Sequence, residues 1–307
     1  MALLVRVYFN AVFGGLGGLL GWMLFGVFGD KKAPDNLVWL QLLLGGALIG
    51  GIIGYFVVSV EAIRDRSVVR FCRLATYGVV LGAAGGAVGM FLGDLVNYHL
   101  VGALGASREG TTGFLHLLGT MLARGLGWMF LGAAVGLSEG VAARSLGKIS
   151  YGTLGGTIGG FLGGGLFGLF YQKTLEQPGA ASLWGALGLT ILGACIGALS
   201  ALVQGVLQPA SVRVLRGWQE GRQYGLDRAV NLLGRDEKAD IALFRDMKVE
   251  KRHALIRRDQ GRYCLVNNGA PPENTLVNGE PVRQTRDLND GDRIQLGNVV
   301  LRFQRSV

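Results

Sequence analysis

The sequence predicts a multi-domain membrane protein: a glycine-rich α-helical transmembrane bundle, followed by a smaller all-β sandwich. The composition changes near Gln208, because 44 of the 53 glycines precede this residue. Residues 1–207 contain only 12 Lys or Arg and 8 Asp or Glu, separated by long apolar runs. The last 100 residues contain 18 Lys or Arg and 13 Asp or Glu, and their short apolar runs are typical of antiparallel strands. We therefore divide the chain into domains 1–207 and 211–307, joined around Pro209.

The bundle is organised around residues 151–171, YGTLGGTIGGFLGGGLFGLFY, which as a helix are about long enough to cross a bilayer. In water each interior glycine would disfavour the helix by about 1 kcal/mol relative to alanine. In lipid the backbone must satisfy its own hydrogen bonds, so the helix forms and the glycines admit a neighbouring backbone. Five glycines share one face and are the predicted helix-packing residues: Gly152, Gly156, Gly160, Gly164 and Gly168.

The glycine pattern is an internal repeat. Four glycines near the N-terminus recur after 68 residues and again after a further 74: Gly14, Gly17, Gly18 and Gly21, then Gly82, Gly85, Gly86 and Gly89, then Gly156, Gly159, Gly160 and Gly163. The alternate spans repeat more loosely, and residues 61–67 (EAIRDRS) resemble residues 139–145 (EGVAARS). We predict six helices in three tandem hairpins, spanning about 7–28, 39–60, 76–97, 118–142, 151–171 and 183–207.

Lysines and arginines in the loops predict the orientation of the bundle. The loops after even-numbered spans carry more of them (Arg64, Arg66, Arg70, Arg73, Arg144, Lys148) than those after odd-numbered spans (Lys31, Lys32, Arg108, Lys173). Positive loops stay in the cytoplasm, so we expect both termini there. The expected location is a bacterial inner membrane.

Four charged residues lie near the ends of predicted spans. We expect Asp94 and Arg124 to form an interfacial pair or to snorkel, with a pathway-lining role as the alternative. Glu61 and Glu139 lie at cytoplasmic ends, where the nearby Arg64 and Arg144 are expected to neutralise them. Cation binding or proton relay is the alternative for these two glutamates.

Nine strands are predicted in the C-terminal domain, over residues 212–215, 222–226, 229–233, 241–243, 252–257, 262–267, 274–277, 292–296 and 299–303. Asn278–Gly279 is a predicted hairpin turn, and residues 289–291 (NDG) are another. These features predict an antiparallel sandwich.

Several motifs of this domain resemble the forkhead-associated (FHA) family. Residues 232–235 (LLGR) resemble its glycine-arginine strand end, and residues 249–256 (VEKRHALI) its serine-x-x-histidine segment. Residues 274–279 (NTLVNG) resemble its asparagine-glycine-threonine hairpin, and residues 288–296 (LNDGDRIQL) and 301–303 (LRF) its closing strands. The resemblance covers about 97 residues and none of the membrane half.

The resemblance implies a β-sandwich whose loops recognise a phosphothreonine peptide. By match, Arg235 would bind phosphate, Lys251 would add a second cation, and Asn274 would hold the peptide backbone. Thr275 is a further expected phosphopeptide-binding residue. His253 would brace the loops structurally.

Two positions depart from the family pattern. Glu250 replaces the phosphate-binding serine, and the glycine between Asn274 and Thr275 is missing. A carboxylate about 4 Å from a phosphate would cost several kcal/mol at a surface-like dielectric. Glu250 could also turn away or neutralise Lys251. Phosphothreonine recognition therefore competes with binding of an unphosphorylated partner or a neighbouring subunit.

Other classes of function have little support. The net charge of +9 divides almost evenly between the two halves, without the basic-aromatic stripe that binds nucleic acid. Cys72, Cys195 and Cys264 lie far apart, and the sequence has neither metal-ligand spacing nor a phosphate-binding loop motif. We expect no cofactor, metal or enzymatic activity.

The leading functional hypothesis is a membrane-anchored adaptor that presents an FHA-like domain to a protein partner, phosphorylated or not, in the cytoplasm. The first alternative is a structural subunit of a larger membrane complex, whose glycine grooves receive other membrane helices. The second is a channel or transporter with a regulatory FHA-like cap.

Overall fold

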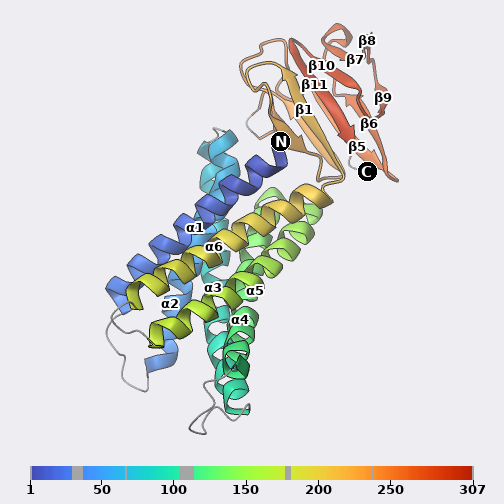
Figure 1. The fold of residues 1–307 in the computed structure, drawn as a ribbon. Coiled ribbons are helices and arrows are strands. Elements are labelled where there is room, and N and C mark those ends of the chain that lie inside the picture. Colours follow the sequence, from blue (N-terminus) through green and yellow to red (C-terminus); the bar gives the residue numbers. More distant parts are fainter. Residues whose placement is uncertain are drawn as a thin grey trace. The chain divides into compact units, whose positions relative to one another are not determined.

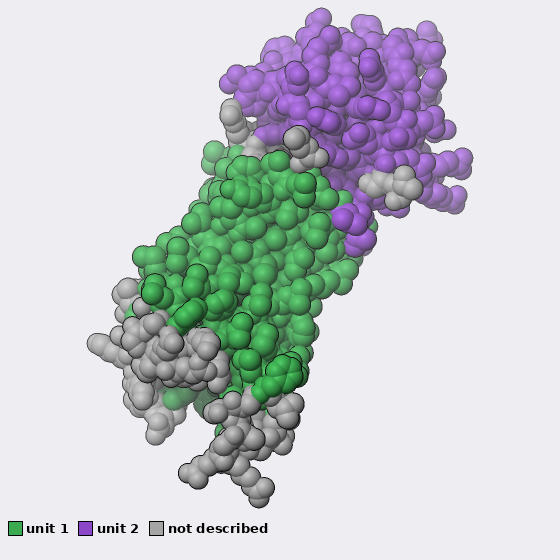
Figure 2. Space-filling model, viewed as in Figure 1, with its two compact units in different colours: residues 1–144, 148–205 green, residues 145–147, 206–307 purple. Residues whose placement is uncertain are grey.

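A computed structural model describes residues 2–29, 37–65, 68–103, 114–176, 181–236 and 238–305. The chain forms two compact units, a helical bundle and a β-sandwich (Figures 1 and 2). The helical unit comprises residues 1–144 and 148–205, and the sandwich unit comprises residues 145–147 and 206–307. Of the loop cations used to predict orientation, Lys31, Lys32, Arg66 and Arg108 lie outside the described residues.

The six helices of the described chain are all long and apolar enough to cross a membrane. They are α1 (Ala2–Gly29), α2 (Val38–Asp65), α3 (Val68–Ala103), α4 (Phe114–Ala143), α5 (Leu146–Glu176) and α6 (Ala181–Leu207). Each contains one predicted span, and α3 extends beyond its span at both ends.

Glycines bring several pairs of helices into backbone contact, most closely α2 with α3, α4 with α5, and α6 with α1. A methyl group on the glycine of the first helix would collide with a carbonyl oxygen of the second, in the pairs Gly50–Gly82, Gly132–Gly156 and Gly193–Gly14. The five predicted glycines of α5 all face α4, where they meet Gly136, Gly132, Trp128, Arg124 and Met121. This α5 face is therefore occupied by protein.

Aliphatic side chains of α2, α4 and α6 form the interior of the bundle. Gly54, Gly136 and Gly197 mark equivalent positions on these helices, because each lies against a backbone carbonyl of a packed neighbour: α3, α5 and α1, respectively. The residues just before them, Ile53, Val135 and Ile196, are at most 1% exposed, and those one turn earlier, Ile49, Leu131 and Leu192, at most 2%. All six belong to one buried cluster.

The glycine contacts also correct the predicted alignment of the even spans. Gly50 and Gly54 correspond to Gly132 and Gly136, a shift of 82 residues, whereas matching residues 61–67 with 139–145 requires a shift of 78. Glu61 and Glu139 are therefore not equivalent and differ by about one helical turn. The alignment failed because close backbone contacts, and not the polar residues at the helix ends, fix the register of packed helices.

The sandwich consists of two sheets (Figure 1). The six-stranded sheet has the order β2-β1-β11-β10-β7-β8, and the five-stranded sheet has the order β4-β3-β5-β6-β9. The strands are β1 (Ala210–Arg216), β2 (Gln223–Gly225), β3 (Val230–Gly234), β4 (Ile241–Ala242), β5 (Ala254–Asp259), β6 (Arg262–Asn267), β7 (Thr275–Val277), β8 (Glu280–Pro281), β9 (Thr285–Leu288), β10 (Arg293–Leu296) and β11 (Val299–Arg305). Only the β3–β4 pair is parallel within the described sheets.

Two strands were missed by the sequence prediction. β8 has only two residues, and β9 exposes its first three side chains, so neither shows the apolar alternation by which strands are recognised. Asn278 and Gly279 have positive φ values of 54° and 88° and join β7 to β8, as predicted. The prediction of a hairpin at residues 289–291 was wrong, because β9 pairs with β6 while β10 pairs with β7 and β11.

Candidate functional site

The end of β3 and the loop before β5 meet through their backbones. Gly234, the last residue of β3, lies against the carbonyl oxygen of Lys251, so that a side chain at this position would collide with it. The next residue, Arg235, donates its backbone N–H to the carbonyl oxygen of Glu250 at 2.9 Å. This glycine therefore lets the chain bring Arg235 beside Glu250 and Lys251, as the family motif implies.

The buried side chain of His253 supports this loop. It is completely buried, and its Nδ1 accepts a hydrogen bond from the backbone N–H of Glu250 at 3.0 Å. Because an N–H can only donate, Nδ1 carries no proton and the ring proton lies on Nε2. Nε2 lies 3.2 Å from the carbonyl oxygen of Asn274 and 3.0 Å from Oγ1 of Thr275. A single imidazole thus connects two loops, which agrees with the structural role expected for His253.

Asn274 and Thr275, adjacent in the chain, differ in their exposure to solvent. Asn274 ends the short 3-10 helix Pro272–Asn274 and is half-buried, so its side chain remains accessible at the loop end. Thr275 is completely buried, and its hydroxyl contacts His253 and the carbonyl oxygen of Pro271. The assignment of Thr275 to peptide contact is therefore corrected: this threonine points inward and supports the loop.

The accessible charges at this end have mixed sign. Glu250 and Lys251 are exposed, and Arg235 is half-buried, with Nη1 at 2.7 Å from the sulfur of Met247. A thioether is a weak acceptor, so a phosphate oxygen would compete well for this guanidinium. The site thus offers two cations and one amide to an anion, opposed by one carboxylate.

Burial lowers the pKa of His253 below its ordinary value of 6.5, with smaller opposing effects from Asn274, Glu250 and Asp246. The unfolded chain would then bind a proton near pH 6.5 that the folded domain does not bind. The stability contributed by neutral His253 is therefore complete above about pH 6.5 and decreases below it.

We expect the free energy of unfolding of residues 208–307 to fall between about pH 7 and pH 5.5, by up to about 1.4 kcal/mol per pH unit. His253 is the only histidine of this domain, so urea denaturation at several pH values measures its effect directly. His253→Asn should lower stability and abolish the slope in this range. An unchanged slope in that variant would contradict the assignment.

The bundle contains a second polar site, which we call the polar ring. It consists of one side chain from each of five helices: Arg6 (α1), Glu61 (α2), Glu139 (α4), Lys148 (α5) and Gln204 (α6). Arg6 donates to Glu61 at 2.6 Å and to Gln204 at 2.7 Å. Lys148 lies 3.3 Å from Glu61 and 3.2 Å from Glu139, and Gln204 donates to Glu139 at 3.2 Å. The circuit of contacts is closed and has no net formal charge.

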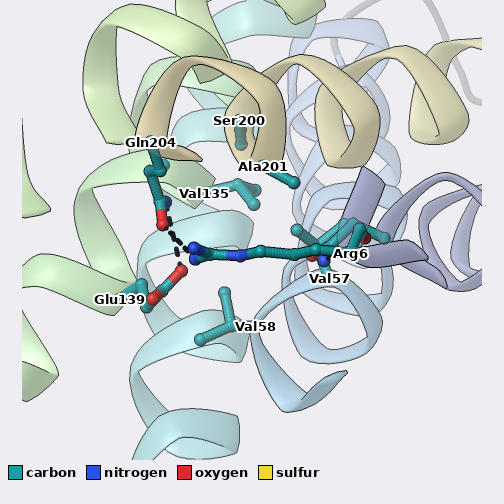
Figure 3. A pocket seen from close by; sticks show the side chains of 10 residues that line it. Arg6, Val57, Val58, Val135, Glu139, Ser200, Ala201 and Gln204 are labelled. Carbon is teal, nitrogen blue, oxygen red and sulfur yellow. Dashed lines mark hydrogen bonds between the residues drawn. The ribbon is translucent and has the colours of Figure 1, made fainter. Parts of the chain in front are cut away.

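A small pocket adjoins the polar ring (Figure 3). Arg6 extends across it toward Glu139 and Gln204, and valines of α2 and α4 form its apolar wall. Ser200 also lines the pocket; it is 4% exposed, and its hydroxyl has no partner within the described chain. The pocket thus places a hydroxyl, a carboxylate and a guanidinium around one small space.

The polar ring corrects the predicted partners of the two glutamates. Both contact Lys148, and Arg144 is exposed to solvent. The side chain of Arg64 lies outside the described residues. Sequence reasoning missed Arg6, Lys148 and Gln204 as partners of these glutamates. Arg6 and Lys148 are separated along the sequence by the sum of the two repeat shifts, 68 and 74 residues, so the repeat could have indicated that they occupy equivalent positions. The predicted pair of Asp94 and Arg124 is present, at 3.4 Å.

The following comparisons with known proteins concern the sandwich. A family model described as the cytoplasmic domain of an inner membrane component of the type III secretion system (T3SS) matches residues 213–306. No curated protein matches the chain.

Three solved structures are similar to the same region. One, from a study of phosphothreonine-dependent FHA domain interactions, is 32% identical, covers 31% of this chain and 95% of its own, and has a TM-score of 0.28. The FhaA FHA domain complexed with the intracellular domain of Rv3910 is 32% identical, with coverages of 31% and 99% and a TM-score of 0.28. The FHA domain of CT664 from Chlamydia trachomatis is 22% identical, with coverages of 32% and 99% and a TM-score of 0.30.

The fold and these motifs define a class: a polytopic membrane protein with a β-sandwich interaction module at its C-terminal end. The forkhead-associated domain predicted from the sequence motifs is confirmed by the family match together with the 32% identity to a solved FHA domain. The C-terminal module belongs to the forkhead-associated family.

Proposed function

We propose that this protein is a membrane-anchored adaptor whose forkhead-associated domain binds a phosphothreonine-containing segment of a partner protein in the cytoplasm. The observation that carries the proposal is the bracing of two loops by His253, which links the backbone of Glu250 to that of Asn274. Arg235, Lys251 and Asn274 are thereby held at one end of the sandwich, and a phosphate needs such converging donors.

The bundle serves as the anchor in this proposal. Aliphatic side chains fill the space between α2, α4 and α6, which favours anchoring over conduction. The loop cations support cytoplasmic termini, and the description of the matching family supports a bacterial inner membrane.

A second candidate is a subunit of a larger membrane complex whose sandwich binds an unphosphorylated partner. Two observations favour it: Glu250 places a carboxylate beside the phosphate-binding cations, and the matching family is described as a component of a membrane secretion system. Binding that does not depend on phosphate distinguishes this candidate from the first.

We expect Arg235→Ala to weaken binding of the best phosphothreonine peptide by roughly 10- to 100-fold, because it removes a charge-assisted hydrogen bond. Fluorescence polarisation with a phosphothreonine peptide library and its unphosphorylated counterpart measures this effect. Arg257→Ala, an exposed arginine on β5, is the matched control and should change nothing.

Glu250→Ser provides the opposite test on the adjoining loop. Removing this carboxylate should strengthen phosphopeptide binding, because it removes a repulsion of the phosphate. Equal binding of phosphorylated and unphosphorylated peptides, with no response to either variant, would reject phosphate recognition and leave the second candidate.

A further inference from the structure

Three arginines form a row across the outer face of the six-stranded sheet. Arg213 on β1 is the register partner of Arg302 on β11, and Arg302 is the partner of Arg293 on β10. Each is exposed, while the residues beside them along the strands, such as Val212, Leu301 and Ile294, are buried in the core. Cross-strand partners stand about 5 Å apart, so three like charges are adjacent on one surface.

Among the described residues, no acidic side chain on this face neutralises the arginine row. The other outward positions on these three strands and on the neighbouring strands β2 and β7 hold no acidic residue: Ser211, Leu215, Gln223, Leu276, Gln295, Val300 and Gln304. At the adjoining turn, Asp292 accepts hydrogen bonds from Asn278 and from the backbone of Asn289, and Asp290 accepts one from the backbone of Arg305. Within the described chain, the three guanidinium groups have no ion-pair partner.

Adjacent like charges on a sheet are unfavourable unless something else compensates them. A guanidinium donates a planar fork of N–H groups that matches phosphate. The compensating partner should therefore present several phosphate-like anions in an extended array. The half-buried aliphatic side chains beside the row, Leu215, Val300 and Leu276, suit a partner that is also partly apolar.

The chain connectivity identifies such a partner. α6 ends at Leu207, and Arg213 follows six residues later, so the linking chain can reach no more than about 20 Å from the end of this apolar helix. Anionic headgroups of the bilayer are thus within reach, and each basic residue near such a surface contributes attraction. We propose that the arginine row binds anionic phospholipid headgroups of the membrane in which the protein is anchored.

The test uses the full chain in lipid nanodiscs, of phosphatidylcholine alone or with added phosphatidylglycerol. A reporter thiol is introduced by Gln304→Cys next to the arginine row, in a Cys72→Ser background, and its reaction rate with an uncharged maleimide is measured. Phosphatidylglycerol should slow the reaction by roughly 100-fold, since each of the three bound arginines contributes about a fivefold preference for the anionic surface. High salt should restore the rate.

The matched control compares two triple variants with the same change in net charge. Replacing Arg213, Arg293 and Arg302 by glutamine should abolish the slowing, whereas replacing Arg257, Arg258 and Arg262 on the five-stranded sheet should preserve it. Equal rates in both lipids, or slowing that survives the first triple variant, would overturn the proposal. Binding of an acidic protein segment to the arginine row, with a labelling rate that does not depend on the lipid composition, would also overturn it. Loop variants such as Arg235→Ala should leave this readout unchanged, which separates it from phosphopeptide binding.

Discussion

Gly160→Leu is expected to prevent accumulation of the folded protein. A side chain at Gly160 would collide with the carbonyl oxygen of Trp128, and the Cα of Met129 lies only 3.0 Å from the position of its first carbon. Both obstacles belong to the backbone of α4 and cannot rotate away, so α4 and α5 must separate. We expect a loss of more than about 3 kcal/mol, at or above the upper end for overpacking of a core.

Gly165→Leu is the matched control on the same helix. The nearest atom to an added carbon there is the carbonyl oxygen of Met121 at 3.5 Å, an ordinary contact distance. This variant should accumulate normally, as judged by size-exclusion chromatography and thermal unfolding in detergent. If both variants behave alike, glycine contacts between α4 and α5 do not determine the packing of the bundle.

Lys148→Ala should destabilise the bundle by about 3 kcal/mol or more. The variant leaves Glu61 and Glu139 with Arg6 as the only remaining cation of the polar ring. All three charged partners are mostly buried, and removing one member of a buried ion pair leaves an uncompensated charge. Thermal unfolding of the purified protein in nanodiscs measures the loss.

Two further variants make this prediction specific. Arg144→Ala removes an exposed cation and should have little effect, although sequence proximity suggested Arg144 as the partner of Glu139. Adding Glu139→Gln to Lys148→Ala should recover part of the stability, because it removes one uncompensated carboxylate. Equal losses for Arg144→Ala and Lys148→Ala would contradict the polar ring.

The bundle was largely predictable because glycine spacing directly records how closely backbones approach. The shifts of 68 and 74 residues placed Gly14, Gly82 and Gly156 at corresponding positions, and each meets a glycine carbonyl of its partner helix. The even spans were misaligned because their polar ends resemble one another while their glycines follow a different spacing. Short exposed strands such as β9 escaped because nothing in their pattern distinguishes them from loops.

The candidate sites were predictable only in part. The motifs located Arg235 and His253 because a strand end and a bracing imidazole have fixed neighbours in this fold. The burial of Thr275 could not be predicted from motif spacing, because spacing does not say which way a side chain points. The polar ring joins residues from five helices, and a single sequence does not reveal which helix ends meet.

The contact between α6 and α1 has a consequence for biogenesis. Of the six described helices, α1 leaves the ribosome before the other five, yet its Gly14 packs against Gly193 on α6, the last of the six in chain order. During synthesis α1 must therefore wait in the membrane with an exposed backbone groove until almost the entire bundle has been inserted. A chaperone or insertase that shields this groove would act on the nascent chain before α6 arrives.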